Sequence, residues 1–458
     1  MKRESLQSRL GFLLLAAGCA VGLGNVWRFP FIVGANGGAA FVLLYLVCLL
    51  LIGYPLLTVE LAIGRGGKAG VVGALSALAF KRFKPFWHKA GWLVYLGNFL
   101  LMMYYSSVTG WLLYYFAKYA LTGLPAATPE ETGVFFNGML AHPLTCVVSM
   151  CVGVAAASCV CAVGVQRGVE RVGKWMMLSL FVLLAVLAVR ALFLPGAKEG
   201  LEFYLKPDFS TVLKHPLQSL FCALGQAFFT LSIGVGCMVI LGSYVGQDRS
   251  LASESLVIIG LDTLVALLSG LIIFPACFSY HVDVGQGPGL IFVALPNVFA
   301  HLPFGRVWGI FFFLFLSLAA LTTLVAVFEC LTAGLIEEFG LSRSKAAFRV
   351  GGLVALLSLP CVFGFNLLKG IQPLGPGSTI LDLEDFLFSQ FWLPIGALTL
   401  TAFCVFTIGW GWQRFRRETR RGTGFGLPKN FRSYMRWILP LIVLAILLGG
   451  IIQKFCVR

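Results

Sequence analysis

The sequence predicts an all-α polytopic membrane protein with about 11 transmembrane helices, arranged as a 5+5 inverted repeat with broken helices 1 and 6, plus an eleventh helix. Three observations support this fold class. The composition is 59% hydrophobic and 12% charged, with a mean hydropathy of +0.91, a balance that a soluble domain could not keep in water. Apolar runs of spanning length recur along the chain, and glycine pairs interrupt two of them.

Each predicted span is an apolar run close to the ~20 residues that a helix needs to cross ~30 Å of hydrocarbon. The gaps between spans hold under thirty residues, too few for a soluble domain, so we expect one membrane domain over residues 1–458. It would comprise a cytoplasmic segment 1–9, a first five-helix repeat 10–194, a second five-helix repeat 217–412 and an eleventh helix 437–455. The predicted spans are 10–33, 39–63, 91–117, 143–163, 172–194, 217–242, 252–279, 307–336, 347–364, 387–412 and 437–455.

Lys and Arg gather in alternate loops. With the N-terminus inside, and with residues at span ends counted in the adjacent loop, 24 of the 34 belong to cytoplasmic loops and 9 to outer ones, and Arg28 alone is counted within a span. Because cytoplasmic loops carry the excess of Lys and Arg, we expect a multi-pass protein of the inner (plasma) membrane with its N-terminus cytoplasmic and its C-terminus outside. Topology and anionic lipid explain the net charge of +15 better than nucleic acid does.

Residue patterns of catalysis are missing from the sequence. The thirteen cysteines are dispersed through apolar runs and suit packing, and the five histidines lie at loops or span ends. There is no Ser/His/acid set, phosphate loop or metal cluster. We therefore predict that the protein is not an enzyme, has no catalytic residues and carries no organic cofactor.

Two spans carry a glycine pair where Leu or Ala would be usual: Gly22-Leu23-Gly24 in span 1 and Gly234-Val235-Gly236 in span 6. Taken singly, each pair is also explained by a close helix crossing. The two pairs lie five spans apart, however, so the two breaks occupy corresponding positions of inverted halves. Unwound backbone exposes carbonyls and amides that lipid cannot satisfy, which indicates a bound ion or ligand.

Residues 18–30, GCAVGLGNVWRFP, match the first-span signature of the neurotransmitter:sodium symporters. The chain resembles this family, and within it the bacterial amino-acid transporter branch, over spans 1 to 10. The resemblance implies a sodium-coupled secondary symporter working by alternating access. Further matching segments are 37–41, 60–65, 104–105, 226–232, 287–290, 321–323 and 382–386.

The resemblance implies two sodium sites near the break in span 1. Sodium prefers several oxygen ligands, which broken helices and hydroxyls supply. Thr322 and Thr323 could instead bond back to their own helix. The first site would use Ala20, Asn25, Thr230, Asp262 and the substrate's carboxylate. The second would use Gly18, Val21, Ala319, Thr322 and Thr323.

For the substrate, the resemblance implies a carboxylate held by the amides at Leu23 and Gly24 and by the Tyr105 hydroxyl. Family members that carry monoamines have an aspartate at the position of Gly22, so glycine indicates an amino acid. The mostly apolar side-chain subsite favours a neutral, hydrophobic L-amino acid, with leucine-like and aromatic substrates both open. That subsite would comprise Leu101, Phe229, Ser232, Val235 and Val327.

Charged pairs would form the gates: Arg28 with Asp385 on the outer side, and Arg3 with Glu337 on the inner side. Solvated charges at loop edges are the alternative for both pairs. Two positions depart from the family pattern. Leu178 replaces a proline associated with unwinding of span 5, and Leu6 replaces a tryptophan of the inner latch.

Asp262 aligns with a neutral asparagine of many family members. Chloride-dependent relatives have a serine one turn further on, where this chain has Ala266. We expect Asp262 to ligate sodium and supply the fixed negative charge, making transport independent of chloride, and it could bind a proton on the return step. A proton-coupled amino-acid permease of the same architecture, an ion channel and a non-transporting amino-acid sensor remain alternatives.

Overall fold

The computed structural model describes residues 6, 8–124, 128–280, 290–428 and 430–455, and helices dominate these ranges. The first half of the chain supplies helices at all five positions predicted for spans 1 to 5. They are α1 (Arg9–Ala20) with the π-helical turn Gly24–Arg28 and α2 (Phe29–Ala35); α3 (Ala39–Cys48) with the π-helical turn Leu49–Gly53 and α4 (Tyr54–Gly67); α6 (Lys84–Leu121); α8 (Pro143–Val163); and the π-helical turn Val165–Glu170 with α9 (Arg171–Leu192).

The second half supplies helices at the positions predicted for spans 6 to 11. Its spans are α12 (Pro216–Thr230) with α13 (Cys237–Gly242); α14 (Leu251–Ser279); α16 (Gly305–Phe339); α17 (Arg343–Phe363); α18 (Ile380–Phe386) with the π-helical turn Leu387–Trp392 and α19 (Leu393–Val405); and α21 (Phe431–Ser433) with the π-helical turn Tyr434–Ile438 and α22 (Leu439–Phe455). Shorter helices in the connections are α5 (Val71–Leu78), the 3-10 turn Lys81–Phe83, α7 (Pro129–Ala141), α10 (Ala197–Leu205), α11 (Ser210–Lys214), the π-helical turn Leu290–Ala294, α15 (Leu295–Ala300) and α20 (Trp412–Thr419).

Membrane-spanning length is met by many of these helices. Among the described residues, 8 continuous helices are long and apolar enough to cross a membrane, and the bent pair of α1 with Gly24–Ala35 makes 9. The long helix α6 and the interrupted pair α12 and α13 occupy the positions predicted for spans 3 and 6. The all-α, multi-span fold class is confirmed, while the count of eleven stays a prediction.

Both predicted interruptions are present. The axis bends by 56° between α1 and the segment Gly24–Ala35. In span 6 the helix stops at Thr230 and resumes at Cys237, and the gap contains positive φ angles at Ser232 (49°), Gly234 (100°) and Gly236 (73°). Two of these three positions are glycine, which adopts positive φ without a Cβ clash.

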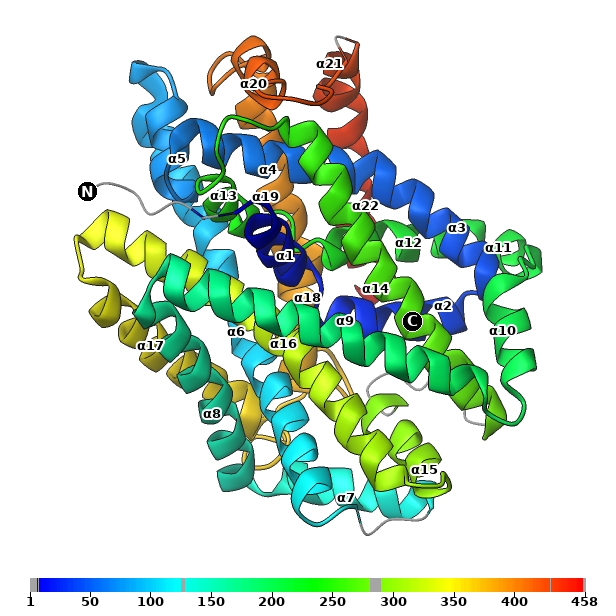
Figure 1. Ribbon diagram of the computed structural model, residues 1–458. Coiled ribbons are helices and arrows are strands. Elements are labelled where there is room, and N and C mark those ends of the chain that lie inside the picture. The colour runs from blue at the N-terminus through cyan, green and yellow to red at the C-terminus, as the bar shows by residue number, and fades with distance from the viewer. Residues whose placement is uncertain (1–5, 7, 125–127, 281–289, 429, 456–458) are drawn as a thin grey trace.

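Long helices enclose the interrupted ones. Helix α1 lies at the centre of the bundle, packed against α9, α14 and α16, and α6 packs along α16 (Figure 1). In the most apolar stretch of α16, 72% of the residues are buried, against 22% in Phe431–Ile451. Span 8 therefore belongs to the core of the bundle and span 11 to its periphery.

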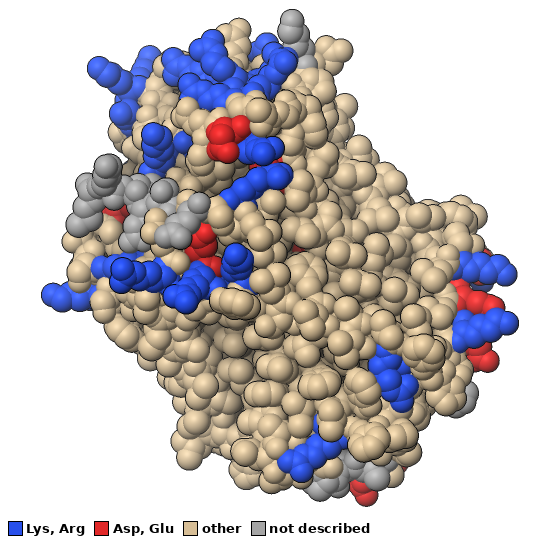
Figure 2. Space-filling view, viewed as in Figure 1, with Lys and Arg blue, Asp and Glu red and all other residues tan. Residues whose placement is uncertain are grey.

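Charged residues avoid the broad flank of the molecule. Figure 2 shows Lys and Arg gathered over the end that carries α20, with a wide uncharged surface below it. In Figure 1 the connecting helices α5 and α20 lie at this end, whereas α7 and α15 lie at the opposite end. The uncharged flank is the surface that lipid would cover.

Span 10 differs from its predicted limits, 387–412. The helix starts at Ile380 because Thr379 forms a capping box with Asp382, whose carboxylate accepts the Thr379 N–H at 2.7 Å. Because Asp382 lies in this first turn, the start of the helix does not belong to an apolar run. At the other end α19 stops at Val405, and the apolar residues that follow form turns ending at Gly411, with φ 85°.

Candidate functional site

The break in span 1 requires small residues because side chains from other helices approach it closely. A Cβ on Gly22 would lie 2.6 Å from Thr323 Oγ1 and 2.8 Å from Tyr105 Oη. A Cβ on Gly24 would lie 2.9 Å from the Phe229 ring. Both glycines thus leave space for side chains from α6, α12 and α16 to reach the unwound backbone.

The break in span 6 is held by a buried carboxylate from span 2. Glu60 is 1% exposed, and its two oxygens accept the backbone N–H of Gly234 at 2.6 Å and of Met238 at 3.2 Å. These amides have no helical partner, so the carboxylate replaces the missing acceptors. Glu60 belongs to the matching segment 60–65, and its contact with the break in span 6 could not be predicted from that match.

One cluster of oxygen atoms joins both breaks to α14. Asn25 Nδ2 donates to the Asp262 carbonyl at 3.0 Å and to Asp262 Oδ1 at 2.8 Å. Thr230 Oγ1 donates to Asp262 Oδ2 at 3.0 Å, and the Gly22 N–H donates to Asn25 Oδ1 at 3.2 Å. The first predicted sodium set, apart from Ala20 at the end of α1, is therefore in direct mutual contact.

Asp262 is fully buried, and no Lys, Arg or His of the described ranges forms an ion pair with it. Its donors are a neutral amide and a neutral hydroxyl. A buried carboxylate without a counter-charge is costly, and a bound cation removes that cost. The donor set of this cluster suits sodium.

A second oxygen cluster lies where α16 touches α1. Thr323 Oγ1 lies within hydrogen-bond distance of the carbonyls of Val21 (3.1 Å) and Gly18 (3.3 Å), so its single hydrogen is shared between two acceptors of span 1. Thr322 Oγ1 donates to Ala319 of its own helix at 2.8 Å and to Val21 at 3.5 Å. The structure thus brings all five residues of the second predicted sodium set together, and only Thr322 also bonds back to its helix.

A small cavity of about 10 Å³ lies between the two breaks. Val235 and Val327, expected in the side-chain subsite, are fully buried and do not line it. Val235 packs instead against α6: its Cγ1 lies 3.0 Å from where a Cβ on Gly97 would be, and its carbonyl accepts Asn98 Nδ2 at 2.8 Å. Phe388 lines the cavity and was missed by sequence reasoning. The lining residues are Ala20, Gly22, Leu23, Gly24, Leu101, Tyr105, Phe229, Ser232, Thr323 and Phe388.

The Tyr105 hydroxyl points toward the break in span 1. Tyr105 is 3% exposed, and its Oη has no hydrogen-bond partner among the described residues. A buried hydroxyl without a partner costs free energy, so this position favours a ligand with an acceptor group. The N-terminal end of the segment that begins at Gly24 lies beside the same cavity.

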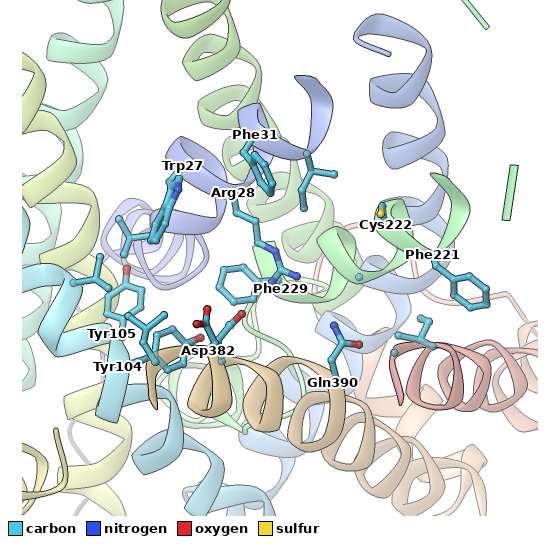
Figure 3. A pocket seen from close by; sticks show the side chains of 18 residues that line it. Trp27, Arg28, Phe31, Tyr104, Tyr105, Phe221, Cys222, Phe229, Asp382 and Gln390 are labelled. Atoms are coloured by element: carbon cyan, nitrogen blue, oxygen red, sulfur yellow. The ribbon is translucent and has the colours of Figure 1, made fainter. Parts of the chain in front are cut away.

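A larger cavity of about 470 Å³ adjoins the small one, because Leu23, Tyr105 and Phe229 line both. Figure 3 shows Arg28 extending over Phe229, and the guanidinium carbon is 4.3 Å from the centre of that ring. Asp385 also lines this cavity, but its Oδ1 accepts Ser389 Oγ at 2.8 Å. Arg28 and Asp385 face the same cavity without forming an ion pair in this conformation.

Polar contacts bridge the opposite end of the pathway. Glu337 accepts the Gly70 N–H at 2.8 Å, Tyr244 Oη donates to Glu329 at 2.6 Å, and Arg9 pairs with Glu254 at 3.0 Å. Arg3, predicted to pair with Glu337, lies outside the described residues. Leu6 packs partly buried against the core, and Leu178 lies within the uninterrupted helix α9. These contacts connect different spans at this end, whereas the larger cavity lies on the side of Arg28 and Asp385.

The fold and this site define a multi-span membrane transporter built around two interrupted helices. The Sodium:neurotransmitter symporter family matches residues 3–138 and 130–457, nearly the whole chain, and the chain belongs to this family. It is therefore a sodium-dependent transporter and not an enzyme.

Relatives of similar length support this assignment. The chain is 35% identical over 446 residues to an uncharacterised sodium-dependent transporter, YhdH, of Bacillus subtilis, covering 96% of each. It is 32% identical over 458 residues to an uncharacterised sodium-dependent transporter of Haemophilus influenzae, covering 98% of each. Its fold is similar to that of MhsT in complex with L-phenylalanine, with a TM-score of 0.87 and 38% identity, covering 98% of this chain and 100% of the other.

Proposed function

We propose that this chain imports a neutral, hydrophobic L-amino acid together with sodium ions, without needing chloride. The observation that carries the proposal is the meeting of two unwound backbones, two oxygen clusters and the unpartnered Tyr105 hydroxyl around one cavity. Helix amides and a hydroxyl suit a carboxylate, and oxygen ligands suit sodium.

In this mechanism the substrate carboxylate binds to the amides at Leu23 and Gly24 and to Tyr105 Oη. Asn25, Thr230 and Asp262 hold one sodium ion beside it, and Thr322 and Thr323 hold a second against the end of α1. Asp262 supplies a fixed negative charge that offsets the sodium charge. Ala266, which follows one turn later on α14, has no side-chain group that could bind an anion.

The substrate's side chain would lie against Leu101, Phe229 and Phe388. These groups are apolar, and the lining of the small cavity contains no charged residue. The relative MhsT was crystallised with L-phenylalanine, which supports an apolar substrate.

We assign the structure to an outward-facing conformation. The open cavity with Arg28 and Asp385 would lie on the external side, and the contacts of Glu337, Glu329 and Glu254 would close the cytoplasmic side. In this orientation the N-terminus would lie in the cytoplasm and the C-terminus outside a plasma (inner) membrane. Pairing of Arg28 with Asp385 above the bound substrate would close the external side.

A thermal-shift screen of the twenty amino acids, with sodium or with potassium, tests the proposal. We expect neutral hydrophobic amino acids to raise the melting temperature only in sodium, because the carboxylate completes the first sodium site. If the same amino acids stabilised the protein equally in potassium, the substrate carboxylate would not be a ligand of the first sodium ion. Stabilisation by charged amino acids alone would contradict the apolar subsite.

A further inference from the structure

A third cavity lies on the lipid-facing flank, between the end of α19 and the start of span 11. It has a volume of about 340 Å³, and every lining residue except Thr401 and Arg436 is apolar or aromatic. Trp437 and Leu441 border it and are 60% and 64% exposed. Since span 11 lies at the periphery of the bundle, this groove opens toward the membrane and not toward the transport pathway.

Arg436 brings an uncompensated positive charge to the groove. Its Nε is buried with no hydrogen-bond partner, and it forms no ion pair within the described ranges. The guanidinium carbon is 5.4 Å from the centre of the Phe406 ring and 5.1 Å from that of Trp437. These aromatic contacts fix the position of the cation but do not neutralise its charge.

Thr401 supplies a second polar group to the groove. It is 2% exposed, and its Oγ1 has no hydrogen-bond partner among the described residues. An unpaired hydroxyl at lipid depth is costly, and α19 offers it no back-bond of the kind that Thr399 makes to Ile395 at 2.8 Å. The groove is thus lined by two hydrogen-bond donors, Thr401 Oγ1 and Arg436 Nε, and neither has an acceptor among the described residues.

The depth of Arg436 matches the headgroup region of a bilayer. Arg436 lies five residues after Phe431, the first helical residue of span 11, or about 7.5 Å along a helix. For a span that enters the bilayer at Phe431, that distance would place Arg436 at the boundary between headgroups and acyl chains. The basic residues gathered at this end in Figure 2 add a positive potential that attracts anionic lipid. Arg432 lies in the first turn of span 11, and the connection before it includes Arg414, Arg416, Arg417, Arg420 and Arg421.

We propose that this groove binds one anionic phospholipid of the cytoplasmic leaflet. Its phosphate accepts hydrogen bonds from the Arg436 guanidinium, a polar oxygen accepts from Thr401, and an acyl chain lies along Leu441. A planar guanidinium suits a phosphate, and the apolar lining suits a hydrocarbon chain, which free phosphate lacks. The lipid links span 10, whose outer end carries Asp385, to span 11.

Native mass spectrometry of the full-length chain tests this site. The delipidated protein is titrated with phosphatidylglycerol or phosphatidylcholine of the same acyl chains. We expect the wild type to retain one phosphatidylglycerol at concentrations at which phosphatidylcholine is not retained. Arg436→Gln should reduce that retention at least fivefold and Arg436→Lys by less, while Arg432→Gln, an exposed cation at the same end, should leave it unchanged.

Quenching of tryptophan fluorescence by brominated phosphatidylglycerol locates the lipid. The quenched fraction should fall in Trp437→Phe and in Arg436→Gln, but not in Arg432→Gln. Equal retention of the two lipids, unchanged retention in a monodisperse Arg436→Gln variant, or equal competition by inorganic phosphate would overturn the proposal. The proposal would also be overturned if the wild type formed a dimer that binds no lipid and Arg436→Gln were monomeric. The groove would then be an interface between two copies of the chain.

Discussion

The side-chain amide of Asn25 donates to both the carbonyl and the carboxylate of Asp262, at 3.0 and 2.8 Å. This contact ties the unwound part of span 1 to α14. Thr230, the last residue of α12, holds the other carboxylate oxygen at 3.0 Å. Three spans therefore meet at one buried acidic group, and occupancy of this site by sodium would fix their relative positions.

Transport should not require chloride, because Asp262 already provides the negative charge that a bound anion would supply. We expect wild-type uptake to be unchanged when gluconate replaces chloride on both sides of a proteoliposome membrane. Asp262→Asn should weaken sodium binding, since it removes the carboxylate, whereas Asp208→Asn in a connecting segment should not. A strong loss of wild-type uptake in gluconate would overturn this role for Asp262.

Removing the hydroxyls of Thr322 and Thr323 should raise the sodium concentration needed for half-maximal uptake. Each lost ligand contributes about 0.5–1.5 kcal/mol, so the double valine variant should show a rise of about tenfold. Thr332→Val is the matched control, since this buried hydroxyl of α16 has no partner in the described structure. Unchanged sodium dependence in the double variant would rule out the second sodium site.

Tyr105→Phe should weaken amino-acid binding about 10- to 100-fold, because a hydrogen bond to a charged group contributes about 1.5–3 kcal/mol. Decarboxylated amines, such as isoamylamine compared with leucine, should bind far more weakly than the amino acid to the wild type. Tyr115→Phe on the same helix is the control, since its hydroxyl donates to Phe292 at 3.1 Å. Equal binding of leucine and isoamylamine, measured by thermal shift, would be incompatible with carboxylate recognition.

Gly22→Ala should lower amino-acid binding at least tenfold. The added methyl group would lie 2.6 Å from Thr323 Oγ1 and 2.8 Å from Tyr105 Oη, so groups of both the sodium and the substrate site would have to move. Gly260→Ala on α14 is the matched control, because its Cβ would meet nothing within 4 Å. If a folded Gly22→Ala variant bound the amino acid with wild-type affinity, the close approach of Thr323 and Tyr105 to Gly22 would not be needed for binding.

The fold class could be predicted because lipid imposes a strong compositional signal and glycine pairs mark the interruptions. The limits of span 10 could not, since acidic residues such as Asp382 begin its helix and the apolar run after Val405 turns. Hydropathy indicates which residues can face lipid, but the start of this helix is determined by the capping residue Thr379. The predicted limits of span 10 therefore differ from the observed ones by several residues, although the span itself was predicted.

The oxygen clusters could be predicted residue by residue because the signature around Asn25 and the hydroxyl pair at Thr322 resemble the family pattern. The lining of the apolar subsite was harder to predict. Val235 follows Gly234, whose φ of 100° sets the direction of the next side chain, and no sequence period applies in unwound backbone. Phe388 reaches the cavity from the π-helical turn after α18, which an apolar run does not distinguish from an α-helix.

Uptake of a labelled hydrophobic amino acid into proteoliposomes tests sodium-coupled import most directly. An inward sodium gradient should drive accumulation above the external concentration, and collapsing that gradient with a sodium ionophore should abolish it. A proton gradient of equal magnitude, with potassium or choline in place of sodium, should drive no accumulation. Accumulation driven by the proton gradient without sodium, or purely passive equilibration under the sodium gradient, would contradict sodium-coupled symport.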